Sequence, residues 1–304
     1  MPDQFRVNDQ APLGLNLRRE PDPSGNNIIA VIPFGNEVTK LADSSVANWW
    51  KVQATLNGTS ATGFVNQRFL TPVASGSGPV THTGVVPVHL TGTNVTRQNE
   101  KRAFPLSETP PTRRHAEDQA SVRVNAINQL IDWFNVESSA RYRPAGGATF
   151  CNIYAYDYCF MTEAYLPRVW WTQQAIVKLV GGQSVPVKFG ETVNEITANG
   201  LTQWFKDWGP TFGWRRTLDL TELQDAANQG RVCITVAKAS GSAHNGHGHI
   251  VAVVPETSVF KAVRVDGKVT KTVQSQAGGH NAEHVVRSWW NDGSYSEFGH
   301  WIHD

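Results

Sequence analysis

The sequence predicts two domains of different class, a small all-β barrel followed by a larger α+β domain with an antiparallel sheet. Residues up to about 73 alternate short apolar runs with turn residues, which is typical of short β-strands. A stretch rich in Gly and Ser, residues 73–80, then interrupts the pattern. Beyond it, segments with helical periodicity come first and strand-like runs come later. A chain of 304 residues is long enough for both domains.

The first domain is expected to span residues 1–73 and to contain five short strands. Apolar and β-branched residues fill these runs, and turn residues separate them. The runs are residues 13–21, 27–35, 37–41, 49–55 and 62–70. An Asn57-Gly58 pair between the last two runs is a strong hairpin signal. Five strands in so short a segment favour a small barrel.

Four stretches of this domain occur in an order found in a known family. They are Leu15-Asn-Leu-Arg-Arg-Glu-Pro, Ile32-Pro-Phe-Gly, Trp49-Trp-Lys-Val and Gly63-Phe-Val-Asn. In this order they resemble the bacterial SH3 (SH3b) family, which implies an SH3-like barrel. The resemblance also implies a binding module, often attached to cell-wall hydrolases, with no chemistry of its own. Most of its aromatic residues are expected in the core, so no binding residue is assigned there.

Residues 74–114 are expected to be a linker and a segment that wraps one of the domains. The Gly/Ser-rich beginning is typical of a flexible linker. The remainder is polar and irregular and has no apolar periodicity for a core of its own. Alternating apolar residues at 85–88 could form an edge strand.

The second domain is expected to span residues 115–304 and to begin with helices. In residues 121–134, Val124, Ile127, Leu130 and Phe134 fall on one helical face. Further helices are expected at 152–164, 200–205 and 220–228, and a β-hairpin at 175–189 with its turn at Gly181-Gly182. Strands are expected at 232–237, 249–254, 263–265, 269–273 and 298–302. Helices followed by an antiparallel sheet make an α+β domain.

Cys151 is the candidate nucleophile. It follows Gly146 and Gly147 and precedes a segment without glycine or proline, so it is expected at a helix N-terminus. The unpaired N–H groups and the positive end of the helix dipole favour a thiolate there. Free cysteines are commonly buried core residues, which is the alternative for Cys151 and the expectation for Cys159 and Cys233.

His249 and Gln276 are the candidate partners of the cysteine. His249 opens an otherwise apolar strand, a position that packing alone does not explain, so its ring could act as general base. Gln276 ends a later strand and could hold the imidazole in the correct tautomer. Gln274 shares a strand face with it and is the second choice. The alternatives are a structural histidine and a glutamine that bonds only to backbone.

A metal site is the competing interpretation of the same loop. His244, His247 and His249 are close in sequence, and His280 or His284 could complete a set of ligands. However, no HExxH motif is present, and no carboxylate has an obvious ligand spacing. No metal and no other cofactor is therefore expected.

Three motifs then occur in a familiar order. They are Cys151-Asn-Ile-Tyr-Ala-Tyr-Asp, Gly248-His-Ile-Val-Ala-Val-Val-Pro and Gln276-Ala-Gly. Together they resemble the CHAP/NlpC-P60 superfamily of papain-like cysteine peptidases and amidases, over roughly residues 115–304. The resemblance implies hydrolysis of a peptidoglycan stem-peptide bond or of the N-acetylmuramoyl–L-alanine amide bond. It implies Cys151 as nucleophile, His249 as base and then acid, and Gln276 as orienting residue.

The resemblance also bears on other residues, on partners and on location. Asn152 is a candidate oxyanion contact, Gln274 a positioning residue, and Asp157 is expected to be structural. A net charge of +1 indicates no nucleic-acid partner, and no apolar stretch is long enough to span a bilayer. No signal peptide is visible, and peptidoglycan is the expected target. We therefore expect a phage lysin, an injected effector or a protein secreted by a non-classical route. An injected effector would have a secretion-machine or immunity partner.

Two alternatives to a cysteine hydrolase stay open at this point. The first is a catalytically inactive protein that only binds the cell wall, because 11 tryptophans could stack on glycan. The second is a metal-dependent hydrolase that uses the histidines from His244 to His249.

Overall fold

The computed structural model describes residues 4–8, 11, 14–24, 27–32, 36–56, 59–72 and 84–303. The chain divides into two compact units, residues 1–79 and 80–304. The predicted Asn57-Gly58 turn and the Gly/Ser-rich stretch at 73–80 lie outside the described residues.

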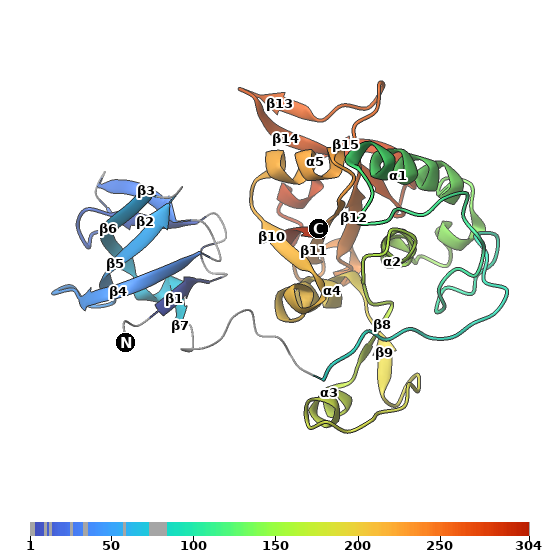
Figure 1. The fold of residues 1–304 in the computed structure, drawn as a ribbon, viewed down its shortest axis with the longest axis horizontal. Coiled ribbons are helices and arrows are strands. Elements are labelled where there is room, and N and C mark those ends of the chain that lie inside the picture. Colours follow the sequence, from blue (N-terminus) through green and yellow to red (C-terminus); the bar gives the residue numbers. More distant parts are fainter. Residues whose placement is uncertain are drawn as a thin grey trace. The chain divides into compact units, whose positions relative to one another are not determined.

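In its described part, the first unit consists of seven antiparallel strands (Figure 1). They are β1 (Gln4–Val7), β2 (Leu15–Arg18), β3 (Ile28–Ile32), β4 (Glu37–Asp43), β5 (Trp49–Leu56), β6 (Thr59–Asn66) and β7 (Leu70–Pro72). They form one sheet in the order β3-β2-β6-β5-β4-β1-β7. The sheet curves around alternate buried side chains such as Leu17, Val52 and Val65. Apart from the short 3-10 helix Gln67–Phe69, the described elements of this unit are strands, and β1 and β7 are strands that the sequence did not predict.

The second unit mixes helices with antiparallel sheets. Its helices are α1 (Ala120–Phe134), α2 (Cys151–Met161), α3 (Gln173–Val180), α4 (Ala198–Asp207) and α5 (Leu220–Asn228). The strands of its large sheet are β10 (Trp214–Thr217), β11 (Val232–Ala239), β12 (His249–Val253), β13 (Val263–Val265), β14 (Lys268–Gln276), β15 (Ala282–Arg287) and β16 (Tyr295–His303). Their order is β10-β16-β11-β12-β14-β13, and β15 also pairs with β14. No helix in the described part of the chain is long and apolar enough to cross a membrane.

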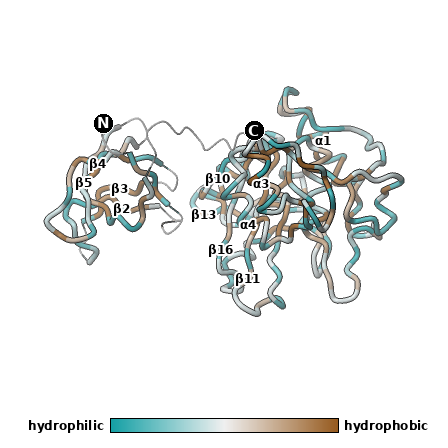
Figure 2. Tube along the Cα trace, turned by 90° about the horizontal axis from the view of Figure 1, so that it is seen from below, coloured by the Kyte–Doolittle hydropathy of each residue, from teal (hydrophilic) through white to brown (hydrophobic). Residues whose placement is uncertain are grey.

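Strand β11 explains how the helices are layered on this sheet. Val232, Ile234 and Val236 belong to the large core that also contains residues of α2 and α4. Cys233 points to the other face, where it packs with Leu223 of α5. Successive strand residues point to opposite faces, so a continuously apolar strand is buried on both. Figure 2 shows the resulting hydrophobic interior of the second unit.

Residues 84–114 belong to the second unit and pack on its core. Val85, Val88 and Val95 are buried in the same core as α2. The described residues 85–88 form no strand, so the predicted edge strand is wrong. The Val88 N–H donates instead to the Tyr165 hydroxyl at 2.9 Å, because side chains of the domain replace a neighbouring strand as partners.

The predicted hairpin at 175–189 is also wrong, because its first half is helix α3. The Thr172 hydroxyl caps the helix by accepting from the Ala175 N–H at 3.3 Å. Ala175 and Leu179, four residues apart, are buried, whereas Val177 and Val180 are exposed. A short run of β-branched residues does not by itself distinguish a strand from a helix. Two short strands outside the prediction, β8 (Val169–Trp171) and β9 (Val193–Glu195), pair beside this helix.

Candidate active site

Helix α2 begins at Cys151, as the sequence predicts. Gly146 and Gly147 have φ of 59° and 80°, a left-handed conformation that glycine adopts without strain. This turn, closed by hydrogen bonds between Ala145 and Ala148, leads the chain into the helix. Nearly all residues of α2 are buried, and Cys151 itself is 5% exposed. The cysteine is thus held at the first position of a helix that runs through the core.

The thiol of Cys151 is surrounded by backbone donors but is buried. The N–H groups of Ile250, Asn152 and Cys151 itself point at the sulfur and lower the pKa of the thiol. Burial has the larger effect and raises that pKa to about 11. The N–H groups at the helix N-terminus therefore lower the thiol pKa, as expected. Desolvation raises this pKa by more, so Cys151 is a neutral thiol at pH 7. This corrects the expectation of a thiolate.

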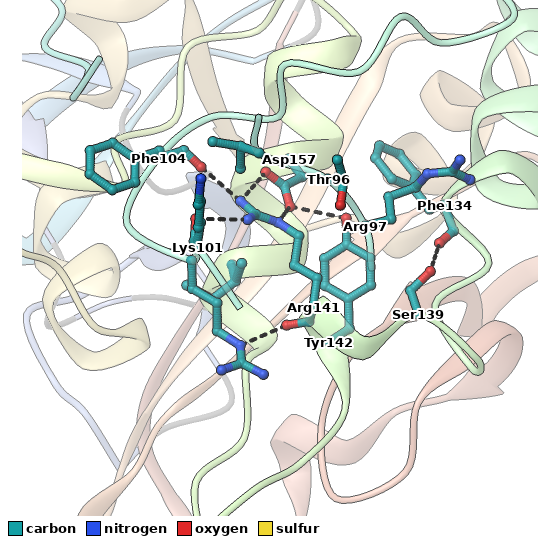
Figure 3. Close-up of polar contacts among 12 residues, drawn as sticks. Thr96, Arg97, Lys101, Phe104, Phe134, Ser139, Arg141, Tyr142 and Asp157 are labelled. Carbon is teal, nitrogen blue, oxygen red and sulfur yellow. Dashed lines mark hydrogen bonds and ion pairs between the residues drawn. The ribbon is translucent and has the colours of Figure 1, made fainter. Parts of the chain in front are cut away.

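A buried ion pair fixes helix α2 from within (Figure 3). The Arg141 guanidinium donates to Asp157 at 2.6 Å and 3.0 Å, and the Tyr142 hydroxyl donates to the same carboxylate at 3.0 Å. Both partners of the ion pair are 0% exposed. Arg141 also donates to the carbonyl groups of Lys101 and Phe104, at 2.9 Å and 2.8 Å, and so ties residues 84–114 to α2. Asp157 is structural, as expected.

His249 is the first residue of β12, and Gln276 fixes its ring. The Gln276 side-chain N–H₂ donates to the His280 carbonyl at 3.0 Å, so its oxygen is the atom that faces His249. That oxygen lies 3.0 Å from His249 Nε2, which is then the protonated nitrogen. The other nitrogen, Nδ1, keeps its lone pair and is available as a base.

Other groups hold the same imidazole ring. The Trp289 ring packs edge-on against it, with centroids 4.7 Å apart. A Cβ at Gly278 would lie 3.2 Å from His249 Cε1, so only glycine leaves the ring undisturbed. Burial lowers the pKa of His249 to about 4, against the opposing effect of the Gln276 hydrogen bond. The imidazole is therefore neutral at pH 7, as a general base must be.

Ile250 links Cys151 to the strand that carries His249. The N–H of Ile250, the residue after His249, points at the cysteine sulfur. Among the described residues, no hydrogen bond joins the cysteine sulfur to the His249 ring. In enzymes without bound substrate, catalytic hydrogen bonds are often long and tighten only when the substrate is bound. The arrangement is thus a neutral thiol that accepts from the N–H of Ile250, and a neutral, oriented imidazole on the preceding residue.

A cleft of about 780 Å³ opens beside His249, and Cys151 is not among the described residues that line it. His249, Gln276 and Thr149, two residues before the cysteine, contribute to its wall. Trp289 and Tyr295 line it as well, and the sequence did not predict either of them. Burial raises the pKa of Tyr295 to about 12, so its hydroxyl is a neutral donor throughout the physiological range. Neither aromatic residue belongs to a local motif that could have identified it.

Asn152 and Gln274, the two remaining predicted site residues, have structural partners. The Asn152 side chain donates to the Ile196 carbonyl at 3.0 Å and accepts from the Ile153 N–H, so only its main-chain N–H faces the sulfur. The buried Gln274 side chain accepts from Trp289 Nε1 at 3.0 Å. Gln274 thus holds the tryptophan that packs on His249, and it acts on the imidazole only indirectly.

The histidines of the metal hypothesis do not converge. In the part of the chain that the structure describes, no three His, Cys, Asp or Glu side chains are placed to hold a metal ion. His244 stacks on Tyr295 with ring centroids 5.1 Å apart, and His284 stacks on Phe260 at 5.2 Å. His249 is engaged by Gln276. The His244–His249 cluster is therefore not assembled as a metal site.

Comparison with known proteins gives two similar structures. No protein-family model and no curated protein matches the chain. The solved structure of NlpC1 from Trichomonas vaginalis is 10% identical with a TM-score of 0.28, and the match covers 100% of this chain and 69% of that one. NlpC2 from the same organism is 10% identical with a TM-score of 0.24, and the match covers 100% of this chain and 72% of that one. Such low scores do not define a common fold, so the chemistry of this chain rests on its own side chains.

Proposed function

We propose that this protein is a cysteine hydrolase that cleaves an amide bond of peptidoglycan, either in the stem peptide or between N-acetylmuramic acid and L-alanine. One observation carries the proposal. A cysteine at the first position of a buried helix accepts from the N–H of Ile250. The residue before Ile250 is His249, the tautomer of which is fixed by Gln276 and which lines an open cleft. A nucleophile, a base and an orienting group are the parts that this chemistry needs.

The first half of the reaction forms an acyl-enzyme. The Cys151 sulfur attacks the carbonyl carbon of the amide while its proton passes to Nδ1 of His249. The main-chain N–H groups that point at the sulfur lie close to where the oxyanion develops and can stabilise it. The tetrahedral intermediate then breaks its C–N bond, and His249 returns the proton to the departing amine. The acyl group stays on sulfur as a thioester.

The second half releases the acid. His249 takes a proton from water, the oxygen of which attacks the thioester carbonyl. The C–S bond breaks, the sulfur takes the proton back from His249, and the carboxylic acid leaves. Gln276 serves both halves because its oxygen stabilises the imidazolium that forms twice in each cycle.

The first unit is proposed to bind the cell wall as an SH3b module. Its sheet has its own core, made of residues such as Leu17 and Val65, and can fold around it. None of the groups proposed for the reaction lies in residues 1–79. Removal of this unit is therefore expected to weaken attachment to intact cell wall and to leave cleavage of small soluble fragments unchanged.

Alkylation of Cys151 tests the nucleophile and its protonation state. Because only the thiolate reacts with iodoacetamide and burial raises the thiol pKa to about 11, we expect the labelling rate to rise about tenfold per pH unit between pH 7 and pH 10. Loss of hydrolysis should follow labelling of Cys151, measured by peptide mass spectrometry. Cys159 and Cys233, which are 0% exposed, serve as internal controls and should remain unlabelled.

Two results would contradict this prediction. Full labelling of Cys151 with hydrolysis retained would exclude it as nucleophile. A rate that is already constant between pH 5 and pH 8 would show a preformed thiolate–imidazolium pair in place of the neutral pair described here.

A further inference from the structure

Two cations line the cleft beside His249. Lys271 of β14 and Arg287 of β15 both line it. Thr272 is the register partner of Arg287, so Lys271 lies one residue before that partner and its side chain starts from the other face of the sheet. Asp292 is the one carboxylate among the described residues that line the cleft, and its Oδ1 accepts from the Ser294 N–H at 2.8 Å.

Neither cation has an anionic partner in the described part of the chain. The side chains of Lys271 and Arg287 form no ion pair and no hydrogen bond there, and the Arg287 main-chain carbonyl accepts from the Gln274 side chain at 2.9 Å. By contrast, Arg264 on the adjacent strand β13 donates to Glu256 at 2.8 Å through two nitrogens. Arginine forks match carboxylates in geometry, and an arginine kept unpaired in a cleft wall remains available to an anionic ligand.

The position of Arg287 indicates which part of a substrate it would contact. Its charge is close enough to His249 to contribute to lowering the imidazole pKa. In the reaction proposed above, His249 gives its proton to the departing amine, so the amine half of the substrate must pass close to His249. A group bound by Arg287 therefore belongs to that half.

We propose that Arg287 and Lys271 form a carboxylate-binding subsite on the leaving-amine side of the cleft. The preferred substrates are then amides whose amine half carries a free carboxylate, such as an acidic amino acid or a peptide with a free carboxyl group. This inference rests on the proposed hydrolase function, because that function defines which side of the cleft receives the amine.

Paired substrates test the subsite. Soluble muropeptides are prepared with free carboxylates or with these carboxylates converted to carboxamides, and kcat and KM are measured for each form. For the free form, we expect Arg287→Gln to lower kcat/KM about tenfold, mainly through KM, since it removes a charge-assisted hydrogen bond. For the amidated form, kcat/KM of wild type should already be about tenfold lower than for the free form. Arg287→Gln should not lower it further.

Matched variants separate the local effect from a general loss of charge or of fold. Lys268→Gln removes a cation that lies on the same strand, β14, but outside the cleft wall. It should change kcat/KM for neither substrate. Arg287→Lys keeps the charge and should retain most of the preference for the free carboxylate. Lys271→Gln should weaken that preference less than Arg287→Gln, because lysine offers a point charge without the planar fork.

The outcomes distinguish this inference from the proposed function. If wild type and Arg287→Gln cleave both forms at the same rates, the subsite is refuted and the hydrolase stands. If wild type cleaves neither form, the proposed function fails. Calorimetry of the binding of each muropeptide form to the Cys151→Ala protein then tests whether the subsite exists. Tighter binding of the free form that is lost in Arg287→Gln would support it, and equal binding of both forms would refute it.

Discussion

His249→Ala is expected to lower kcat for amide hydrolysis by about 10²–10⁴-fold, because the variant lacks the group that takes and returns the proton. Gln276→Ala should have a smaller effect of the same kind, since the ring remains but loses the contact that selects its tautomer. Both variants should keep KM for soluble muropeptides within a few-fold of wild type. The measurement is kcat and KM on these substrates as a function of pH.

Gln276→Glu separates an orienting role from a merely structural one. A carboxylate next to Nε2 would stabilise the imidazolium and raise the pKa of His249. Since the base must be deprotonated, the acidic limb of the pH–rate profile should move to higher pH in this variant. His247→Ala is the matched control, because His247 lines the same cleft but is assigned no role. Equal losses in His247→Ala and His249→Ala would contradict the account and favour a shared histidine cluster.

Asp157→Asn is expected to reduce the free energy of unfolding of the second unit by about 3–5 kcal/mol. The variant leaves the Arg141 charge in a site where both side chains are 0% exposed. Hydrogen exchange of the α2 amides measures the effect in this unit alone. The control is Glu191→Gln, which removes one partner of the exposed pair Lys188–Glu191, with side chains 57% and 67% exposed, and should cost about 0–1 kcal/mol.

The buried Arg141–Asp157 pair allows a second comparison. A double variant in which apolar residues replace both Arg141 and Asp157 should be less destabilised than Asp157→Asn, because it leaves no unpaired charge in the core. The freed carbonyl groups of Lys101 and Phe104 would keep part of the cost. If Asp157→Asn costs no more than Glu191→Gln, the ion pair does not hold α2 in place.

The elements predicted well are those with strong local signals. The start of α2 follows from the glycine pair and the uninterrupted segment after Cys151, and α1 and α5 follow from apolar periodicity. Helix α3 was not predictable in this way, because its β-branched residues favour a strand and only the tertiary contacts of Ala175 and Leu179 select the helix.

In the candidate site, too, some features were predictable from the sequence and others depend on tertiary structure. Sequence order alone pairs His249 with Gln276, and the structure joins them by a hydrogen bond, while their catalytic roles remain predictions. The sequence could not indicate the thiol pKa of Cys151, since burial of the whole helix decides it. Trp289 and Arg287 were missed because the β14–β15 pairing brings them to the cleft from positions with no local motif.

Mass spectrometry of the fragments that wild type and Cys151→Ala release from purified peptidoglycan tests whether this protein is a cysteine hydrolase. We expect wild type to create new peptide termini or freed lactyl groups, and Cys151→Ala to retain binding but to create neither. The identity of the new ends also names the bond that is cleaved. Release of the same fragments by both proteins, or by neither while both still bind, would contradict a cysteine hydrolase.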